Sequence, residues 1–348
     1  MLAAIESGDA ILDADLLEQL EASRGRPGFE FVRRGLLLKQ AERDRLSKLT
    51  PAQKRRAITR RTFEDNEATV DDLRHVHSVL AICGLPYRSV PIDVRTFERR
   101  QGNMALDVTA GSLRDDQGQR IMQPLPYGPK ARLILMHLCS QAVYNRSPVV
   151  DLNETFTAFV RELGFNDSGG PRGALTAFKN QLNALAACSM SVSVWQPGLR
   201  VRTERITPIK SFDLWLSDNL HQRALWPSSL VFSLDFFESL KAHALPVNIR
   251  AIRAFAGSAR TLDAYYWLSY RITRLKKTTS ISWEALAAQF GNDYARLRDF
   301  KKGFADDMKS ISDVFPKLPV RLTETGLEML PAGPDVLALP VPRPSRKA

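Results

Sequence analysis

Cysteine is scarce in this chain of 348 residues. Its three cysteines, Cys83, Cys139 and Cys188, are odd in number and far apart, and Cys139 falls on the apolar face of a predicted helix. Such a set does not supply the disulfide framework of a small secreted domain. We therefore expect buried, reduced thiols.

Long apolar runs are also missing. No stretch of about 18 apolar residues occurs, so the sequence predicts no membrane-spanning helix. The N-terminus lacks the basic stretch and apolar run of a signal peptide, so we expect a cytoplasmic protein. The Gly-x-x-x-x-Gly-Lys-Ser/Thr loop is absent, which argues against intrinsic ATPase activity, and no cofactor is expected.

Histidine is sparse, with five residues in the chain. The tripeptide His75-Val76-His77 resembles the metal-binding motif of rolling-circle nucleases, in which a tyrosine, here Tyr87 or Tyr144, attacks the phosphodiester. Alternating histidines share a face on a strand, whereas residues 70–83 fit a helix better. No further His or carboxylate cluster marks a metal site. We therefore expect no metal and no enzyme activity, with a surface or capping His pair and a nicking enzyme as the two interpretations of the motif.

Positive charge is what the chain has in excess. Lys and Arg number 49 against 38 acidic residues, which gives a net charge of +11 and an isoelectric point of about 9.7. This balance suits nucleic acid or an anionic membrane surface as a partner. Hydrophobic residues make up 44% of the chain, enough to build cores in two or three domains.

Residues 282–329 carry the most informative pattern. A short helix is predicted from Trp283 to Phe290, Gly291-Asn292 breaks it, and a long basic helix follows. The alternation from Val320 to Met329 around a turn at Thr323 to Gly326 predicts a hairpin. This order is typical of a helix-turn-helix with a wing.

The long basic helix is amphipathic, with basic and acidic side chains on separate sectors. Its apolar residues recur at helical spacing and predict one buried stripe, formed by Leu297, Phe300, Phe304, Met308 and Ile311. A sector of one charge suits phosphate contacts, and an ordinary solvated face is the alternative interpretation. The DNA-contacting residues predicted on this helix are Arg298, Lys301, Lys302 and Lys309.

A less regular copy of the same order lies upstream. Residues 130–144 form an apolar helix, residues 155–163 a second helix, and residues 164–171 a long turn before a third. The third helix carries Arg, Lys and Asn, which can read base edges or bind phosphates. Two strands around Gln196-Pro197-Gly198 predict a second, basic wing. The DNA-contacting residues predicted in this copy are Arg172, Thr176, Lys179, Asn180, Asn183, Arg200 and Arg202.

The N-terminal 62 residues have an acidic segment followed by a basic one. The basic block could contact phosphates, the acidic segment could fold back on it, or both could form a solvated tail. Downstream, a helix at residues 70–83 and a hairpin of Met104 to Val108 with Arg120 to Pro124 predict a small sheet or a self-association surface.

The predicted fold class is α+β and mainly helical, with two tandem winged-helix domains, β-hairpin wings and a flexible basic N-terminal extension. The predicted domains are the extension at residues 1–62, the helix plus hairpin at 63–124, the first winged helix at 125–218, the second at 219–335, and a disordered tail at 336–348.

Five further runs are Leu125-Pro126-Tyr127-Gly128, Leu163-Gly164-Phe165, Ser168-Gly169-Gly170, Leu262 to Arg271, and Ser282-Trp283 with Gln289-Phe290-Gly291. These runs resemble the RepA family of plasmid replication initiators. The resemblance covers roughly residues 75–335, and its specific parts are the runs around Trp267 and from Trp283 to Gly291. Because the matching residues are mainly core and turn positions, the DNA-contacting residues rest on the helix faces alone.

The resemblance implies binding to repeated sites, or iterons, in double-stranded plasmid origin DNA, opening of the duplex, and recruitment of the host initiator DnaA, replicative helicase or primase. It also implies repression of the protein's own promoter as a homodimer, in a bacterial cytoplasm near plasmid and nucleoid. The residues alone do not separate an initiator from a sequence-specific transcriptional repressor, because both would use the same winged helices.

Overall fold

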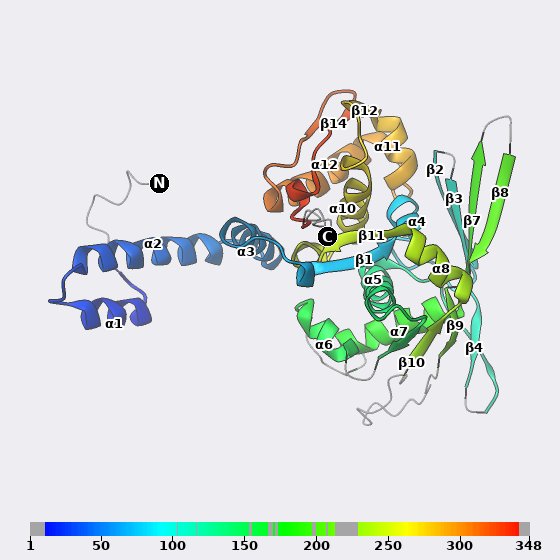
Figure 1. Ribbon diagram of the computed structural model, residues 1–348, viewed down its shortest axis with the longest axis horizontal. Coiled ribbons are helices and arrows are strands. Elements are labelled where there is room, and N and C mark those ends of the chain that lie inside the picture. The colour runs from blue at the N-terminus through cyan, green and yellow to red at the C-terminus, as the bar shows by residue number, and fades with distance from the viewer. Residues whose placement is uncertain are drawn as a thin grey trace, which may run out of the picture. The chain divides into compact units, whose positions relative to one another are not determined.

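The computed structural model describes residues 11–340, except for residues 103, 116, 153–154, 166–169, 171–172, 197–199, 207 and 213–228. It describes the backbone alone at residues 155–157, 194–196, 200–206 and 212. The chain divides into two compact units, Met1–Ile58 and Thr59–Ala348. As predicted, the fold is α+β and mainly helical (Figure 1). Among the described residues, no helix could cross a membrane.

The first unit contains a helical hairpin of α1 (Ala14–Ser23) and α2 (Phe29–Ser47), followed by α3 (Pro51–Asp65), which continues into the second unit. Arg43 of α2 lies 2.7 Å from Asp15 and 3.0 Å from Asp13, and its guanidinium lowers the pKa of the Asp15 carboxyl. Of the interpretations left open for the N-terminal 62 residues, the structure therefore has the one in which the acidic segment folds back on the basic one.

The first winged helix has three helices and a three-stranded antiparallel sheet of order β6-β10-β9. Its β10 pairs with both β6 and β9, so the domain boundary predicted at residue 218 is wrong and the module reaches Phe232. Its elements are α5 (Gly128–Asn145), β6 (Val149–Asp151), α6 (Thr155–Glu162), α7 (Ala174–Ala187), β9 (Ile209–Phe212) and β10 (Ser229–Phe232).

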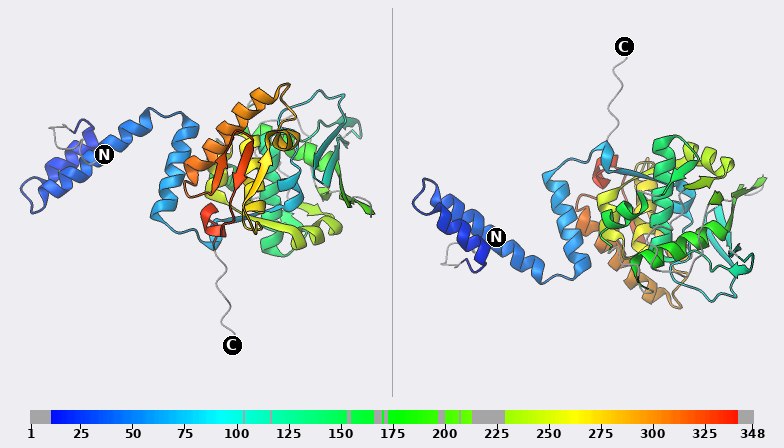
Figure 2. Two further views of the ribbon diagram at one scale, coloured as in Figure 1. Left: turned by 90° about the horizontal axis from the view of Figure 1, so that it is seen from above. Right: turned by 90° about the horizontal axis from the view of Figure 1, so that it is seen from below.

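The second winged helix repeats this topology, with a sheet of order β12-β14-β13 that lies beside α12 in Figure 2. The predicted short helix and hairpin are confirmed, and four of the five stripe residues of α12 are buried, whereas Leu297 is 37% exposed at the helix start. The elements are α10 (Ala259–Ile272), β12 (Thr279–Ser282), α11 (Trp283–Phe290), α12 (Leu297–Val314), β13 (Val320–Leu322) and β14 (Gly326–Met329).

An antiparallel pair of strands joins the two modules. β1 (Leu73–His77) pairs with β11 (Ala244–Asn248), and the short helices α4 (Ser78–Ile82) and α9 (Ile249–Phe255) follow them, with α8 (Leu234–His243) before β11. The helix predicted at residues 70–83 is therefore wrong for residues 73–77, because a partner strand far along the chain recruits them into a sheet, whereas residues 78–82 are helical as predicted. The modules share one hydrophobic core.

A four-stranded sheet of order β2-β3-β7-β8 stands at one edge of the second unit (Figure 1). The predicted pairing of residues 104–108 with 120–124 is wrong, because β3 pairs with β2 and β7 while the turn at residues 115–119 closes the hairpin β4–β5. The strands are β2 (Thr96–Gln101), β3 (Met104–Thr109), β4 (Ser112–Arg114), β5 (Arg120–Met122), β7 (Ser189–Gln196) and β8 (Arg200–Ile206).

The C-terminal segment packs on the core as far as residue 340. Leu337 and Leu339 are buried, and the Asn248 side chain donates a 2.8 Å hydrogen bond to the Ala338 carbonyl. The predicted disordered tail is wrong for residues 336–340, and its remainder lies outside the described residues. The three cysteines are free and buried, as expected, and burial raises the pKa of each thiol to about 12.

Candidate nucleic-acid interface

A polar clamp fixes the rotation of α12 about its axis. Asp307 is 5% exposed and accepts hydrogen bonds from Arg260 and, at 2.6 Å, from the Thr261 hydroxyl, both on α10. Arg260 also donates to the Gly303 carbonyl at 3.0 Å, and a Cβ at Gly303 would lie 2.2 Å from the hydroxyl oxygen of Tyr294. Because Asp307 is held inward, the opposite side of α12 must face outward.

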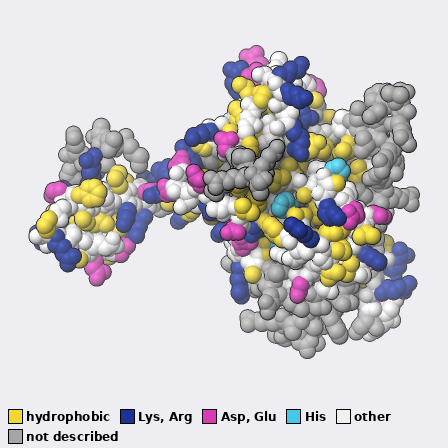
Figure 3. All heavy atoms as spheres, in the orientation of Figure 1, with side chains coloured by type: hydrophobic (Ala, Val, Ile, Leu, Met, Phe, Trp, Pro, Cys, Tyr) yellow, Lys and Arg dark blue, Asp and Glu magenta, His cyan; other side chains and the backbone are white. Residues whose placement is uncertain are grey.

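That outward side carries the predicted basic residues. Arg298 is 82% exposed in its side chain, and Lys302 and Lys309 are also exposed. At 100° per residue these three lie within about 40° of one another, while Asp306 lies further round the helix. Figure 3 shows Lys and Arg side chains on the part of the molecule that the second winged helix forms. We call this sector the positive strip; Asp299, whose carboxylate lies 3.7 Å from Arg298, and the exposed Asp306 lie along one border of it.

Lys301 differs from the other three bases. It is partly buried, and its ammonium lies 5.4 Å from the centre of the Trp283 ring. Hydrogen bonds from its own backbone and from Ser282 are the main causes that lower the pKa of the Glu284 carboxyl, and the charge of Lys301 lowers it further. Lys301 thus packs α12 against the first helix of the pair and stands at the edge of the positive strip.

The wing of the second module is short and firmly held. The Trp283 indole N–H donates to the carbonyls of Thr323 at 3.2 Å and Glu324 at 3.0 Å. On the wing, Arg321 and Glu328 pair across the strands at 2.7 Å. The turn therefore presents hydroxyl groups and a carboxylate, and Arg321 is the base nearest to it on the wing strands.

Gly326 ends the wing turn in a backbone conformation that other residues rarely adopt. Its φ is +157°, and a Cβ there would lie 1.8 Å from the Ile281 carbonyl oxygen. We expect Gly326→Ala to lower the free energy of unfolding by more than about 1 kcal/mol, since both strain and overlap oppose it. Urea unfolding would measure the loss. Gly102→Ala is the control, because φ is +52° there with open space around it, and an equal cost at both positions would contradict the role of the overlap.

The third helix of the first module, α7, is more covered than predicted. Thr176 donates a 2.8 Å hydrogen bond to the Gly170 carbonyl, Lys179 is partly buried and Asn180 is exposed. Asn183 is 7% exposed, so its prediction as a DNA contact is wrong. The backbone at Gly111 packs so closely on the end of α7 that a Cβ there would lie 1.9 Å from the Ala187 carbonyl oxygen.

The predicted basic wing of the first module is also corrected. Arg200 and Arg202 lie on β8, the edge strand of the four-stranded sheet, and their side chains are not described. The hairpin that corresponds topologically to a wing is β9–β10, which the sequence pattern missed because residues 213–228 separate its strands. Arg172 lies outside the described residues. The structure therefore leaves Thr176, Lys179 and Asn180 as the described candidates on α7.

His77, the second histidine of the His-Val-His tripeptide, has a structural role. His77 Nδ1 accepts the Val79 N–H at 3.2 Å and so caps α4, and Nε2 lies 3.0 Å from the Ser239 hydroxyl. Among the described residues, no group of three or more His, Cys, Asp or Glu could hold a metal ion. Tyr87 is buried against Arg99, and burial raises the pKa of its phenol. The capping interpretation is confirmed for His77.

Two buried histidines make the stability of the fold depend on pH. Burial lowers the pKa of His77 from 6.5 to about 4, and that of His137, which stacks on Phe159, to about 3. Below pH 6.5 these histidines become protonated in the unfolded chain but stay neutral in the folded one. The free energy of unfolding is therefore highest above pH 6.5 and decreases as the pH falls. We expect about 1.4 kcal/mol per pH unit for each histidine. Urea midpoints between about pH 6.5 and pH 5 measure the slope, which His137→Phe should reduce; an unchanged slope would contradict this assignment.

Part of the chain is similar in sequence to a known protein family. Residues 125–285 match the family model described as plasmid encoded RepA protein. The match covers just under half of the chain, so this segment is similar to the plasmid-encoded RepA family. No curated protein sequence matches the chain. A selenomethionine crystal structure of domains 2 and 3 of RctB is 11% identical, with a TM-score of 0.43 over 70% of this chain and 87% of that one. Another structure of the same domains has 11% identity and a TM-score of 0.42 over 67% of this chain and 83% of that one.

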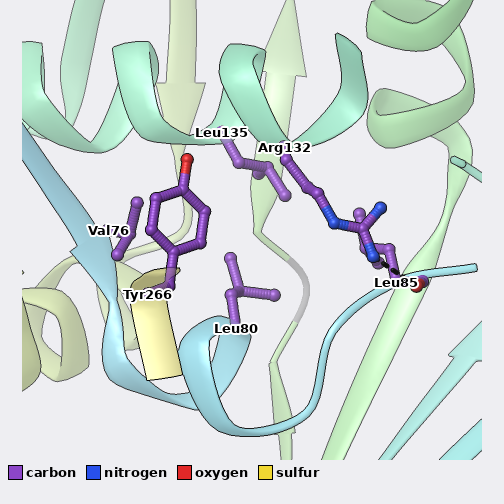
Figure 4. A pocket seen from close by; sticks show the side chains of 6 residues that line it. All are labelled: Val76, Leu80, Leu85, Arg132, Leu135 and Tyr266. Carbon is purple, nitrogen blue, oxygen red and sulfur yellow. Dashed lines mark hydrogen bonds between the residues drawn. The ribbon is translucent and has the colours of Figure 1, made fainter. Parts of the chain in front are cut away.

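The segment that matches the RepA family model, residues 125–285, contains the buried ion pair that connects the two modules. Arg132 on α5 donates to Asp263 on α10 at 2.6 and 2.7 Å, and both side chains are 4% exposed. Figure 4 shows Arg132 reaching toward Leu85 beside a small cavity that Tyr266 and Leu135 also line. At about 10 Å³ the cavity is at most as large as one water molecule, so it serves packing rather than ligand binding.

Proposed function

We propose that this protein is a plasmid replication initiator that binds repeated double-stranded sites at the origin through its two winged helices. The observation that carries the proposal is the positive strip of Arg298, Lys302 and Lys309, which a buried clamp holds outward on a winged-helix frame. The RepA match at residues 125–285 supports the plasmid setting. In a winged helix, this second helix of the pair is the element that enters the major groove.

The two modules would act together on one stretch of DNA. They lie in one compact unit, and the strand pair β1–β11 and the pair of Arg132 with Asp263 link them. We therefore propose that α7 and α12 contact successive major grooves, with Thr176, Lys179 and Asn180 as the contacts from α7. If about eight phosphates are neutralised, log K falls with log salt at a slope of about −7.

The remaining steps need no chemistry within this chain. We propose that binding energy and DNA deformation open the duplex, and that the host initiator DnaA, the replicative helicase or primase is recruited to the opened site. The protein is thus a DNA-binding protein of the bacterial cytoplasm rather than an enzyme. Binding at repeats that overlap its own promoter would repress transcription.

Fluorescence anisotropy on repeat-containing origin DNA and on a scrambled duplex of equal length tests the proposal. We expect tight binding to the repeats alone, with a steep salt dependence and intact strands on a denaturing gel in magnesium. Equal binding to both duplexes, or a magnesium-dependent nick, would overturn it. A plasmid-maintenance assay then separates an initiator from a repressor, because a repressor would not sustain an origin-dependent plasmid.

A further inference from the structure

A side chain without charge lies among the bases on the outward face of α12. Ala305 comes four residues after Lys301 and three after Lys302, and its side chain is partly exposed. At about 100° per residue, it lies within about 60° of each base of the positive strip. It lies about 160° round the helix from Asp307, which the clamp holds inward. Ala305 is therefore on the outward face, beside the edge that Lys301 forms.

Packing does not account for an alanine at this position. The hydrophobic core includes Phe300, Phe304 and Met308 of the same helix but not Ala305. Lys and Arg have long side chains that can reach sideways to phosphates, whereas the methyl group of alanine extends only a short way from the helix. The backbone of α12 can therefore come closer to another molecule at Ala305 than at the bases around it.

The spacing of Ala305 from Arg298 is that of base-contacting residues. A helix that reads the major groove can present the residues at positions i, i+3, i+4 and i+7 to the base edges. Counted from Arg298, near the start of α12, these positions hold Lys301, Lys302 and Ala305. Over seven residues the helix advances about 10 Å, which corresponds to about three base pairs. Arg298 and Ala305 would therefore face different base pairs of one site.

We propose that Ala305 makes α12 specific for thymine at one position of the origin repeat, through contact of its methyl group with the C5-methyl group of the base. The inference rests on the proposed function, because it needs α12 in the major groove. Thymine presents a methyl group there, and alanine is one of the side chains that contact it. Arg298 and Lys302 carry donors that suit either guanine or phosphate, whereas the contact of Ala305 depends on a base alone.

Replacement of single thymines by uracil in a repeat-containing duplex tests the inference. Uracil forms the same base pair as thymine and lacks only the C5-methyl group, so it removes one side of the contact. At one thymine position, we expect uracil to weaken wild-type binding about fourfold, the effect of one buried methyl group. Ala305→Gly should bind the unmodified repeat about fourfold more weakly and should not respond to uracil at that position. Fluorescence anisotropy at constant salt measures each affinity.

Two further variants separate the contact from helix stability. Ala242→Gly is the matched control, because Ala242 is an exposed alanine of α8 and glycine lowers helix propensity there too. It should bind like the wild type and respond to uracil as the wild type does. Ala305→Leu keeps a strong helix former and should weaken repeat binding by about tenfold or more, since the longer side chain would hold the helix away from the bases.

The outcomes distinguish this inference from the proposed function. Equal responses of the wild type and Ala305→Gly to uracil at every thymine, with binding still specific for the repeats, would overturn the inference and leave the initiator proposal in place. Unchanged repeat binding by Ala305→Leu would contradict the close approach of α12 and overturn the inference as well. Equal binding of the wild type to repeats and to a scrambled duplex would overturn the proposed function itself.

Discussion

Asp263→Ala is expected to lower the free energy of unfolding by about 3–5 kcal/mol, because it breaks a buried ion pair by removing one partner. Asp263 pairs with Arg132, and it also lies 3.7 Å from Arg99, whose side chain is 2% exposed. Removing the carboxylate takes this counter-charge away from two buried guanidinium groups. Because Arg132 and Asp263 lie on α5 and α10, the contact between the winged helices should weaken.

Urea unfolding followed by fluorescence and circular dichroism measures this loss. The control is Glu328→Ala, which removes a 2.7 Å ion pair whose Arg321 side chain is 73% exposed and which should cost at most about 1 kcal/mol. The double variant Asp263→Leu with Arg132→Met should regain part of the loss, because it removes charges instead of isolating one. A loss below about 1 kcal/mol for Asp263→Ala would contradict the role of the pair.

Local patterns predicted the second winged helix well because its elements are close in sequence. The apolar period of α12, the break at Gly291 and the short turn before Gly326 all lie within one segment. The first winged helix was predicted less accurately for a physical reason. Its sheet joins β9 and β10 across residues 213–228, and a separate hairpin with strong alternation lies between α7 and β9. Alternation identifies strands but does not identify their partners.

The errors at individual site residues have the same origin. Asn183 falls on a polar position of α7, yet the chain at Gly111 covers this end of the helix from a distant segment. The pairing of Arg132 with Asp263 joins residues 131 apart, which no period or motif reveals. By contrast, Arg298, Lys302 and Lys309 were placed correctly on an exposed face, because the buried stripe of the same helix determines where they point.

The double variant Arg298→Ala with Lys302→Ala is expected to weaken binding to origin repeats by at least tenfold. Each side chain lies on the exposed strip of α12, away from the buried stripe of the same helix. A good base contact contributes about 1–3 kcal/mol and a phosphate contact less, so two losses together exceed a factor of ten. If both residues contact phosphates, the salt slope should also fall by about 2.

The matched control is Lys241→Ala with Arg253→Ala, which removes the same charge from exposed positions on α8 and α9. This control should change the affinity for origin repeats much less. General attraction to DNA depends on the net charge of the protein, whereas contacts in a groove depend on the position of each side chain. Unfolding curves of both variants should match that of the wild type. Equal weakening by the two variants would mean that DNA responds to net charge alone, and unchanged affinity for the α12 variant would exclude this helix from the interface. A loss confined to the α12 variant, with the salt slope unchanged, would instead assign Arg298 and Lys302 to base edges.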